Sequence, residues 1–340
     1  MIKIELNSTI LDEHLKYCEF DEKGRRTSLT KKLKKEIENC SNEKIKDLLE
    51  LLKLNLKTLA IGNPIELNHF KEIVCSKIDS IVQEEQHIED LKETINKLLI
   101  TIFHTEYNRF VNANDAQLWG AYAFVEALDI SICPYCNSQF IFTLRKKGGK
   151  TRPVLDHYFC KSKYPFLAIS IYNLIPCCKV CNSDFKGDTE VSLDTVIRPY
   201  LDNFHEFVKF KRQLIPESSA DYFSTMIGET NDFEIILDFN NIPKDIRHKY
   251  ENHADLFQIK DIYQFHKKHV KELILKSRIY NDIYSEQLKT SYSKLFNSDE
   301  NLKQTLIPKD DEINNIILSK LTKDIVLNEL PHSIKIKSKL

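Results

Sequence analysis

The stretch "CPYCN", residues 133–137, and the stretch "CKVCN", residues 178–182, repeat one five-residue pattern, with 41 residues between the inner cysteines. A Cys-x-x-Cys pair presents two thiolates to one metal ion, and two pairs complete the tetrahedral sulfur shell that structural zinc prefers. We therefore expect one structural Zn²⁺, held by Cys133, Cys136, Cys178 and Cys181. Cys177 could replace Cys178, but only Cys178 keeps the two-residue spacer. A redox dithiol or ordinary buried cysteines are the alternatives.

The composition limits the class of protein. The chain has 340 residues, 42% of them apolar, which is enough for a folded core. Its nine cysteines are an odd number and are clustered, which fits a metal site in a reducing compartment better than a disulfide framework. The sequence shows neither a basic segment leading into an apolar signal core nor a run of apolar residues long enough to cross a bilayer. We expect a soluble, cytoplasmic protein with no membrane partner.

The pattern along the chain predicts an α+β fold, mainly α-helical, in three parts: a helical region over 1–125, a central zinc-stapled unit over 126–200, and short strands followed by helices over 201–340. Apolar residues at three- and four-residue spacing predict the helices. A short strand is expected at "IKIEL" (2–6). Two strands are expected around the Gly-Gly turn of "QFIFTLRKKGGKTRPVLDHYF" (139–159), and others at "EFVKFKRQLI" (206–215) and "FEIILDFN" (233–240). Gly187 can end a short helix after the second cysteine pair.

Polar residues of a particular kind lie between and after the cysteine pairs. Asp156 and His157 are adjacent in a predicted strand, Asn173 precedes the second pair, and Asn182 follows it directly. Adjacent residues on a strand point to opposite faces, so Asp156 and His157 are expected to have different tasks. One can hold a metal ion while the other acts as a base beside it. Alone, an Asp-His dipeptide is most often an ordinary surface feature, and its place between the cysteine pairs favours the functional interpretation.

In this order, the motifs from Cys133 to Gly187 resemble the zinc-bearing branch of the HNH nucleases, whose active unit is a β-hairpin and helix called ββα-metal. The resemblance implies a hydrolase that cleaves phosphodiester bonds as an endonuclease. It implies that His157 is the general base, that Asp156 and Asn182 hold one catalytic Mg²⁺ or Mn²⁺, and that Asn173 braces the loop and orients His157. The family often has histidine where this chain has Asn182, which favours Mg²⁺, and proline where it has Cys160.

Basic residues gather in the same stretch. From Arg145 to Lys186 there are nine Lys or Arg against two acidic residues, although the net charge of the whole chain is only −1. Such a cluster is expected to bind the phosphates of nucleic acid. The candidates are Lys146, Lys147, Lys150, Arg152, Lys161, Lys163, Lys179 and Lys186. DNA is the default substrate, while RNA, including tRNA, remains open because such a site acts on a phosphate.

Two further segments, "IRPYLDNFHEFVKF" (197–210) and "LFQIKDIYQFHKKHVKEL" (256–273), resemble the trailing parts of HNH proteins from Septu-type and retron-associated anti-phage systems. That resemblance implies a role in antiviral defence with an ATPase subunit as partner, and a docking or regulatory role for the helical region over 1–125. A different class of function is a zinc-knuckle module that binds nucleic acid or protein without cleaving it. The set of Asp156, His157 and Asn182 favours the nuclease, because a pure binder does not need it.

Overall fold

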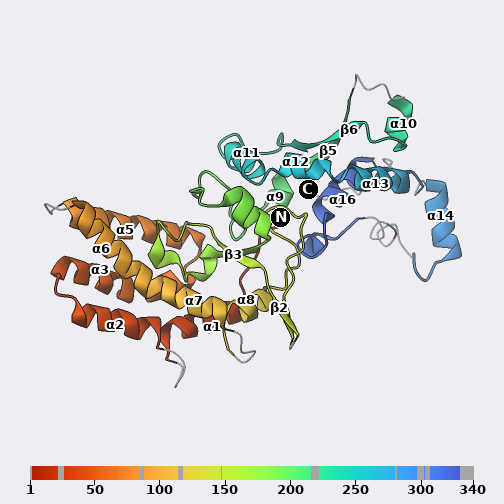
Figure 1. The fold of residues 1–340 in the computed structure, drawn as a ribbon. Coiled ribbons are helices and arrows are strands. Elements are labelled where there is room, and N and C mark those ends of the chain that lie inside the picture. Colours follow the sequence, from red (N-terminus) through yellow and green to blue (C-terminus); the bar gives the residue numbers. More distant parts are fainter. Residues whose placement is uncertain are drawn as a thin grey trace.

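The computed structural model describes residues 2–21, 27–83, 88–113, 118–146, 148–215, 222–279, 282–296, 302 and 307–329. The architecture is α+β: most of the chain is helical, and within the described ranges the strands form three separate two-stranded antiparallel sheets. Figure 1 shows the helices of the first third of the chain on one side, those of the last third on the other, and the green central segment with β3 between them. The predicted α+β class is thus confirmed.

The first third of the chain is helical, as the spacing of its apolar residues predicts. In α2, for example, Leu29, Leu33 and Ile37 are buried, and the Ser28 side chain caps the helix by accepting a hydrogen bond from the Lys31 amide. The elements are α1 (Ser8–Glu19), α2 (Leu29–Asn39), α3 (Glu43–Leu54), α4 (Leu56–Ile61), α5 (Pro64–Gln83), α6 (Ile88–Leu99), the π-helix η1 (Ile100–His104), α7 (Thr105–Asn112) and α8 (Ala121–Leu128). Among the described residues, no helix has the length and apolar character needed to span a membrane.

The expected opening strand over 2–6 does not form. The Ile4 amide donates to the carbonyl of Pro199 at 2.7 Å, but no ladder of bonds develops around this contact. An isolated backbone bond ties the N-terminal segment to the middle of the chain without making a sheet.

The central segment contains β1 (Leu144–Lys146), β2 (Gly149–Thr151), β3 (Val154–His157), the 3₁₀ turns η2 (Pro165–Leu167) and η3 (Ile171–Asn173), β4 (Leu174–Cys177) and the π-helix η4 (Val180–Lys186). The expected hairpin around Gly148 and Gly149 forms as the short pair β1–β2. β3 belongs to a different sheet and pairs with β4, with His157 opposite Leu174. Gly187 ends η4 with a φ of +48°, as expected of glycine after a helix.

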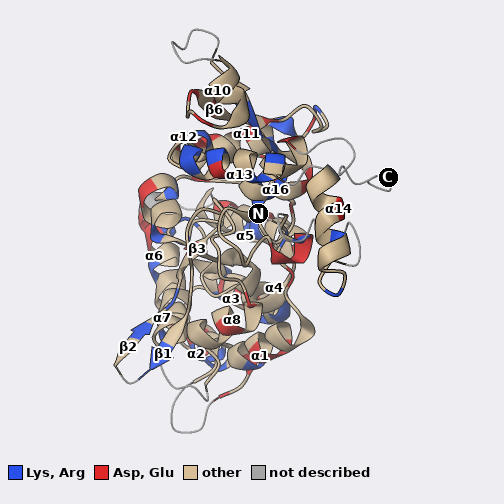
Figure 2. Ribbon diagram, turned by 90° about the vertical axis from the view of Figure 1, so that its right-hand side faces the viewer, with Lys and Arg blue, Asp and Glu red and all other residues tan. Residues whose placement is uncertain are grey.

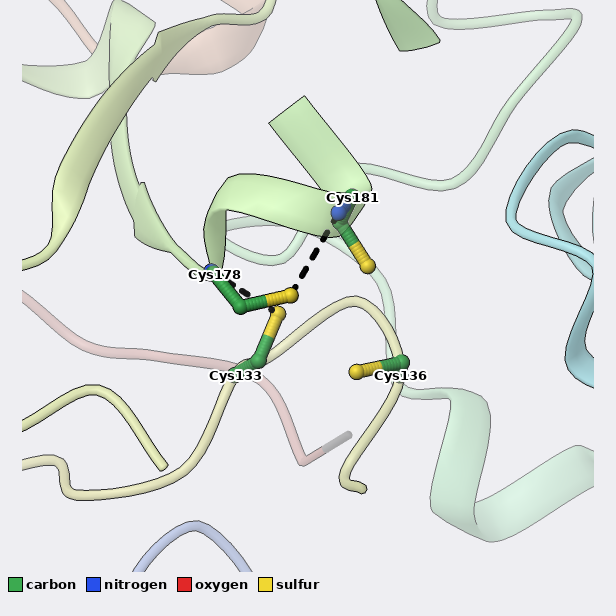
Figure 3. Close-up of side chains that lie close together, drawn as sticks. All are labelled: Cys133, Cys136, Cys178 and Cys181. Carbon is green, nitrogen blue, oxygen red and sulfur yellow. Dashed lines mark hydrogen bonds between the residues drawn. The ribbon is translucent and has the colours of Figure 1, made fainter. Parts of the chain in front are cut away.

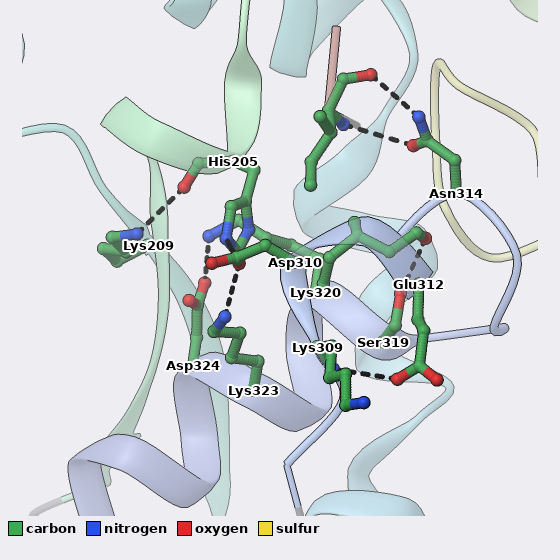
Figure 4. A network of polar contacts seen from close by, with 12 residues as sticks. His205, Lys209, Lys309, Asp310, Glu312, Asn314, Ser319, Lys320, Lys323 and Asp324 are labelled. Carbon is green, nitrogen blue, oxygen red and sulfur yellow. Dashed lines mark hydrogen bonds and ion pairs between the residues drawn. The ribbon is translucent and has the colours of Figure 1, made fainter. Parts of the chain in front are cut away.

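The last third contains α9 (Phe204–Phe207), β5 (Lys209–Leu214), α10 (Tyr222–Ile227), β6 (Phe233–Asp238), α11 (Arg247–Leu256), α12 (Ile259–Gln264), α13 (Lys267–Ile279), α14 (Asp282–Ser291), η5 (Asp310–Glu312) and α16 (Ser319–Glu329). The two strands predicted here are confirmed as β5 and β6. A polar network joins α9, η5 and α16 (Figure 4): His205 Nε2 lies 2.8 Å from Asp310 Oδ1, and the buried Lys320 pairs with Asp324.

One continuous hydrophobic core contains residues from all three parts of the chain. Asn137, which has a left-handed φ of +54°, shows how the parts are joined. Its Nδ2 donates to the Ile313 carbonyl at 2.7 Å, and its Oδ1 accepts from the Lys320 amide at 3.1 Å. The asparagine after the first cysteine pair therefore links the central segment to the C-terminal helices.

Candidate active site

The four cysteines of the two pairs meet at one point in the fold (Figure 3). Their sulfur atoms all lie within 4.8 Å of one another, and all four residues are buried. The Cys178 amide donates to Cys133 Sγ and the Cys181 amide donates to Cys178 Sγ, both at 3.4 Å. Cys177 is not part of the group. The second pair is therefore Cys178 and Cys181, which have two residues between them.

The sulfur cluster fits a tetrahedral metal ion. Four thiolates at about 2.3 Å from a central zinc lie about 3.8 Å apart, which is compatible with the observed grouping. Zinc binds thiolates, so each of the four cysteines would release its proton on binding the ion. The cluster can therefore hold a metal such as Zn²⁺, as expected from the sequence.

Side chains of the C-terminal helices support the first cysteine pair through its backbone. His253 Nε2 of α11 lies 3.1 Å from the Tyr135 carbonyl, and the Tyr263 hydroxyl of α12 donates to the Cys136 carbonyl at 2.7 Å. Such outer contacts fix the orientation of the residues that bind a metal. The cluster of four cysteines is therefore coupled to the packing of α11 and α12.

Asp156 lies on β3 and is almost completely buried. Its Oδ2 accepts a hydrogen bond from the Tyr135 hydroxyl at 2.6 Å, and its Oδ1 accepts one from Lys186 Nζ at 2.8 Å. Lys186, at the end of η4, also donates to the His157 carbonyl at 2.7 Å. The carboxylate is therefore held between the first cysteine pair and the helix that follows the second.

His157 faces other neighbours. Its Nε2 lies 2.9 Å from the Ala168 carbonyl, and because a carbonyl only accepts, Nε2 carries the proton. Burial lowers the pKa of His157 to about 3, so the imidazole is neutral at pH 7. In this tautomer Nδ1 has a lone pair that can accept a proton.

Asn173 is fully buried and holds the loop between β3 and β4. Its Oδ1 accepts from the Phe159 amide at 2.8 Å, and its Nδ2 donates to the carbonyls of Phe159 and Leu167, each at 3.1 Å. The Ala168 carbonyl that holds His157 comes directly after Leu167. These are the contacts expected of a residue that braces the loop and so orients His157.

Helices of the first third of the chain also contact this loop. The Tyr107 ring of α7 lies edge-on to the His157 ring, with centroids 4.5 Å apart. His104 Nε2 lies 3.0 Å from the Lys161 carbonyl, and His14 Nε2 lies 2.8 Å from the Ile169 carbonyl. The N-terminal helices thus form one wall around His157.

A pocket of about 440 Å³ opens beside β3 and η4. It is lined by residues of three elements and the loops between them: Tyr107, Arg152, Val154, Leu155, Asp156, His157, Cys160, Lys161, Asn182, Ser183, Lys186, Gly187 and Asp188. The structure therefore brings Asp156, His157 and Asn182 to one pocket, while Asn173 lies behind it.

The donor types in this pocket fit a hard divalent cation. Asn182 Nδ2 donates to Ser183 Oγ at 3.2 Å, which leaves the amide oxygen as the group that can bind a cation. Asp156 supplies a carboxylate, and oxygen ligands of these two kinds suit Mg²⁺ or Mn²⁺. The Lys186 ammonium already neutralises Asp156, so a cation at this carboxylate would compete with Lys186 for Oδ1.

The basic candidates have different locations. Arg152, Lys161 and Lys186 line the pocket. Lys146, Lys150 and Lys179 are exposed outside it, while Lys163 pairs with Glu190 at 2.6 Å beside a neighbouring groove. Lys186 is only 3% exposed, so its ammonium faces Asp156 and not solvent. Lys147 lies outside the described residues.

Two residues of the pocket region were not identified from the sequence. Tyr135 lies inside the first cysteine pair, where the motif marks only the cysteines, and Tyr107 lies 50 positions before His157 on an ordinary amphipathic helix. Neither position carries a local signal, because only the fold brings them to β3.

Comparison with protein-family models gave no match, and comparisons with curated proteins and with solved structures gave none either.

Proposed function

We propose that this chain is a metal-dependent endonuclease of the HNH type that hydrolyses phosphodiester bonds in nucleic acid. DNA is the default substrate, and RNA, including tRNA, is the alternative. The observation that carries the proposal is the location of His157: it lines a polar pocket with Asp156 and Asn182, and its Nε2 is anchored to the Ala168 carbonyl, which leaves Nδ1 as the acceptor. The ββα-metal resemblance of residues 133–187 supports the same function.

In the proposed mechanism, His157 Nδ1 takes a proton from the water that attacks the scissile phosphate. Asn173 and the Ala168 carbonyl keep the ring in place, and Tyr107 limits its movement from the other side. Asp156 and Asn182 would hold the divalent cation, which would stabilise the negative charge that develops on the phosphate. Arg152 and Lys161, which line the pocket, would contact the same phosphate.

The cysteine cluster has a structural role in this proposal. A metal ion held by both pairs would fix the first pair, whose Tyr135 donates to Asp156 on β3, relative to η4, which carries Asn182. The proposal extends to anti-phage defence with an ATPase partner, on the basis of the resemblance of residues 197–210 and 256–273.

The first test is cleavage of plasmid DNA and of bulk tRNA by the wild type and by His157→Ala, with Mg²⁺ or Mn²⁺ and without added divalent cation. Because a general base contributes about 10²- to 10⁴-fold, His157→Ala should lose cleavage by that factor. The control is His69→Ala, which removes an exposed histidine on α5 outside the pocket. Zinc content and circular dichroism show that each variant is folded.

Cleavage that persists in His157→Ala would contradict the proposed role of this residue. If the folded wild type cleaves neither substrate, the assay is repeated with the ATPase partner added. Failure in that assay as well, together with binding of nucleic acid, would replace the nuclease with the zinc-knuckle binding module.

A further inference from the structure

An exposed apolar stripe lies between the first cysteine pair and the β1–β2 hairpin. Phe140 is 58% exposed, Phe142 is 61% exposed and Leu144 is 39% exposed, whereas Ile141 between them is buried. This alternation is that of an extended chain with one face inward and one outward. Large apolar side chains in a row on the surface indicate an interaction site.

The stripe is held in place at both ends. The Ile141 amide donates to the Ser131 carbonyl at 2.9 Å, and the Cys133 amide donates to the Gln139 carbonyl at 2.9 Å, so its beginning is bonded to the first cysteine pair. Its end runs into β1, which pairs with β2. The aromatic side chains therefore project from a fixed backbone.

Positive charge lies at the hairpin end of the stripe. No acidic residue occurs between Asp129 and Asp156 in the sequence, while the hairpin carries Arg145, Lys146 and Lys150. Figure 2 shows this hairpin projecting from the helices with its strands in blue. Arg145 is already paired with Glu126, but Lys146 and Lys150 are exposed. Apolar rings beside exposed cations fit a polyanion that has flat apolar groups.

The same segment leads directly into the candidate active site. Arg152, one residue after β2, lines the pocket, and its Nη1 donates to the Pro153 carbonyl at 2.7 Å just before β3. The end of β2 therefore adjoins the pocket, and a strand of nucleic acid with a phosphate in the pocket could extend onto the hairpin.

We propose that Phe140 and Phe142 form a stacking surface for unpaired bases, with Lys146 and Lys150 binding the adjoining phosphates. The inference rests on the proposed nuclease function and narrows its substrate to nucleic acid with single-stranded nucleotides beside the scissile phosphate. Base faces are accessible only where bases are unpaired, and aromatic rings bind them with little regard to sequence. Alternate side chains of an extended chain lie about 6.6 Å apart. This is about twice the ~3.4 Å spacing of successive nucleotides along one nucleic-acid strand, so one base can fit between the rings of Phe140 and Phe142.

The test measures binding and not cleavage, in the His157→Ala background and without divalent cation. Fluorescence anisotropy follows a labelled single-stranded DNA, a single-stranded RNA of the same sequence, and the DNA duplex. Replacing both phenylalanines by alanine should weaken single-strand binding by about tenfold or more for each ring, and should leave duplex binding unchanged. Replacing both by tyrosine should preserve binding, because the rings remain. Comparison of the DNA and RNA arms identifies the substrate class.

The matched control is Phe265→Ala, which removes a phenylalanine that is 87% exposed at the end of α12. It should bind all three probes like the parent. An equal loss for single strand and duplex, no loss in the double alanine variant, or no binding of any probe would overturn the inference. So would sedimentation that shows a wild-type dimer and a monomeric double alanine variant, because a second copy would then cover the stripe.

Cleavage and binding assays together distinguish a failure of the stacking surface from a failure of the proposed nuclease function. Cleavage that depends on His157 but is unchanged in the double alanine variant would remove only the stacking surface. Single-strand binding that depends on the two rings, in a protein that never cleaves, would remove the nuclease and keep the surface.

Discussion

Asp156 and Lys186 form a buried ion pair at the base of the candidate site, with a third contact from the Tyr135 hydroxyl. Removing two charges from water costs free energy, which the pair and its extra hydrogen bonds offset. If only one partner is removed, the other charge remains buried without compensation. Breaking this pair is therefore expected to lower the free energy of unfolding more than breaking an exposed ion pair of similar length.

We predict that Lys186→Met lowers the free energy of unfolding by about 3–5 kcal/mol, because it leaves the Asp156 carboxylate buried and uncompensated. The double variant Asp156→Asn with Lys186→Met should recover most of that loss. Urea unfolding measures both. The matched control is Lys163→Met, which removes an exposed pair with Glu190 and should cost less than about 1 kcal/mol. A double variant as unstable as Lys186→Met would show that the two charges are not coupled.

The sequence predicted that the adjacent residues Asp156 and His157 point to opposite faces of a strand, and in the structure their side chains contact different neighbours. It could not predict that Lys186 turns back to Asp156, which lies 30 positions earlier. A long flexible side chain can face solvent or a buried carboxylate with the same local sequence, and only the packing of η4 against β3 decides between them.

At the scale of elements, the two cysteine pairs determine how the central segment is arranged. The strand patterns predicted the β1–β2 hairpin and the strand with Asp156 and His157, but not that β3 pairs with β4. Alternation of apolar residues identifies a strand without identifying its partner. β4 runs directly into the second cysteine pair. The pairing of β3 with β4 is therefore consistent with the position of the four-cysteine cluster at the end of β4.

The adjacent Cys177 and Cys178 allow a matched test of the cluster. We predict that Cys178→Ser abolishes stoichiometric zinc binding and lowers the melting temperature, because a serine hydroxyl does not replace a thiolate in a zinc shell. Cys177→Ser should keep one zinc per chain, since its sulfur is outside the cluster although the residue is also buried. Metal analysis of the purified proteins measures this. Loss of zinc from Cys177→Ser and its retention in Cys178→Ser would reverse the assignment.

At the scale of the whole molecule, the three parts of the chain share one core, and the first two of them line the pocket. The pattern of apolar residues predicted most N-terminal helices, yet it could not show that Tyr107 packs against His157 or that His14 contacts the Ile169 carbonyl. These contacts depend on helix docking, which periodicity does not specify. The helices over 1–125 therefore contact the candidate site and the loop beside it directly.

Buried histidines give the whole molecule a predictable response to acid. His253 is completely buried against the stacked rings of Tyr135 and Phe257, and burial lowers its pKa from 6.5 to about 3. The folded protein thus binds fewer protons than the unfolded chain between these two values. The contribution of His253 to the free energy of unfolding is therefore fully present above pH 6.5 and is lost as the pH falls toward 3. Burial lowers the pKa of His157 and His205 to about 3 as well, so the three effects have the same sign.

We predict that lowering the pH from 7 to 5 reduces the free energy of unfolding, with about 2 kcal/mol of the loss due to His253. His253→Gln should lose about 2 kcal/mol less over this range, because glutamine can still donate to the Tyr135 carbonyl but takes up no proton. Urea unfolding at both pH values, with zinc content checked at each, measures the difference. The control His69→Gln removes an exposed histidine and should follow the wild type. An unchanged pH dependence in His253→Gln would mean that burial does not lower the pKa of this histidine. The loss of stability in acid would then come from the cysteine cluster or from the other histidines.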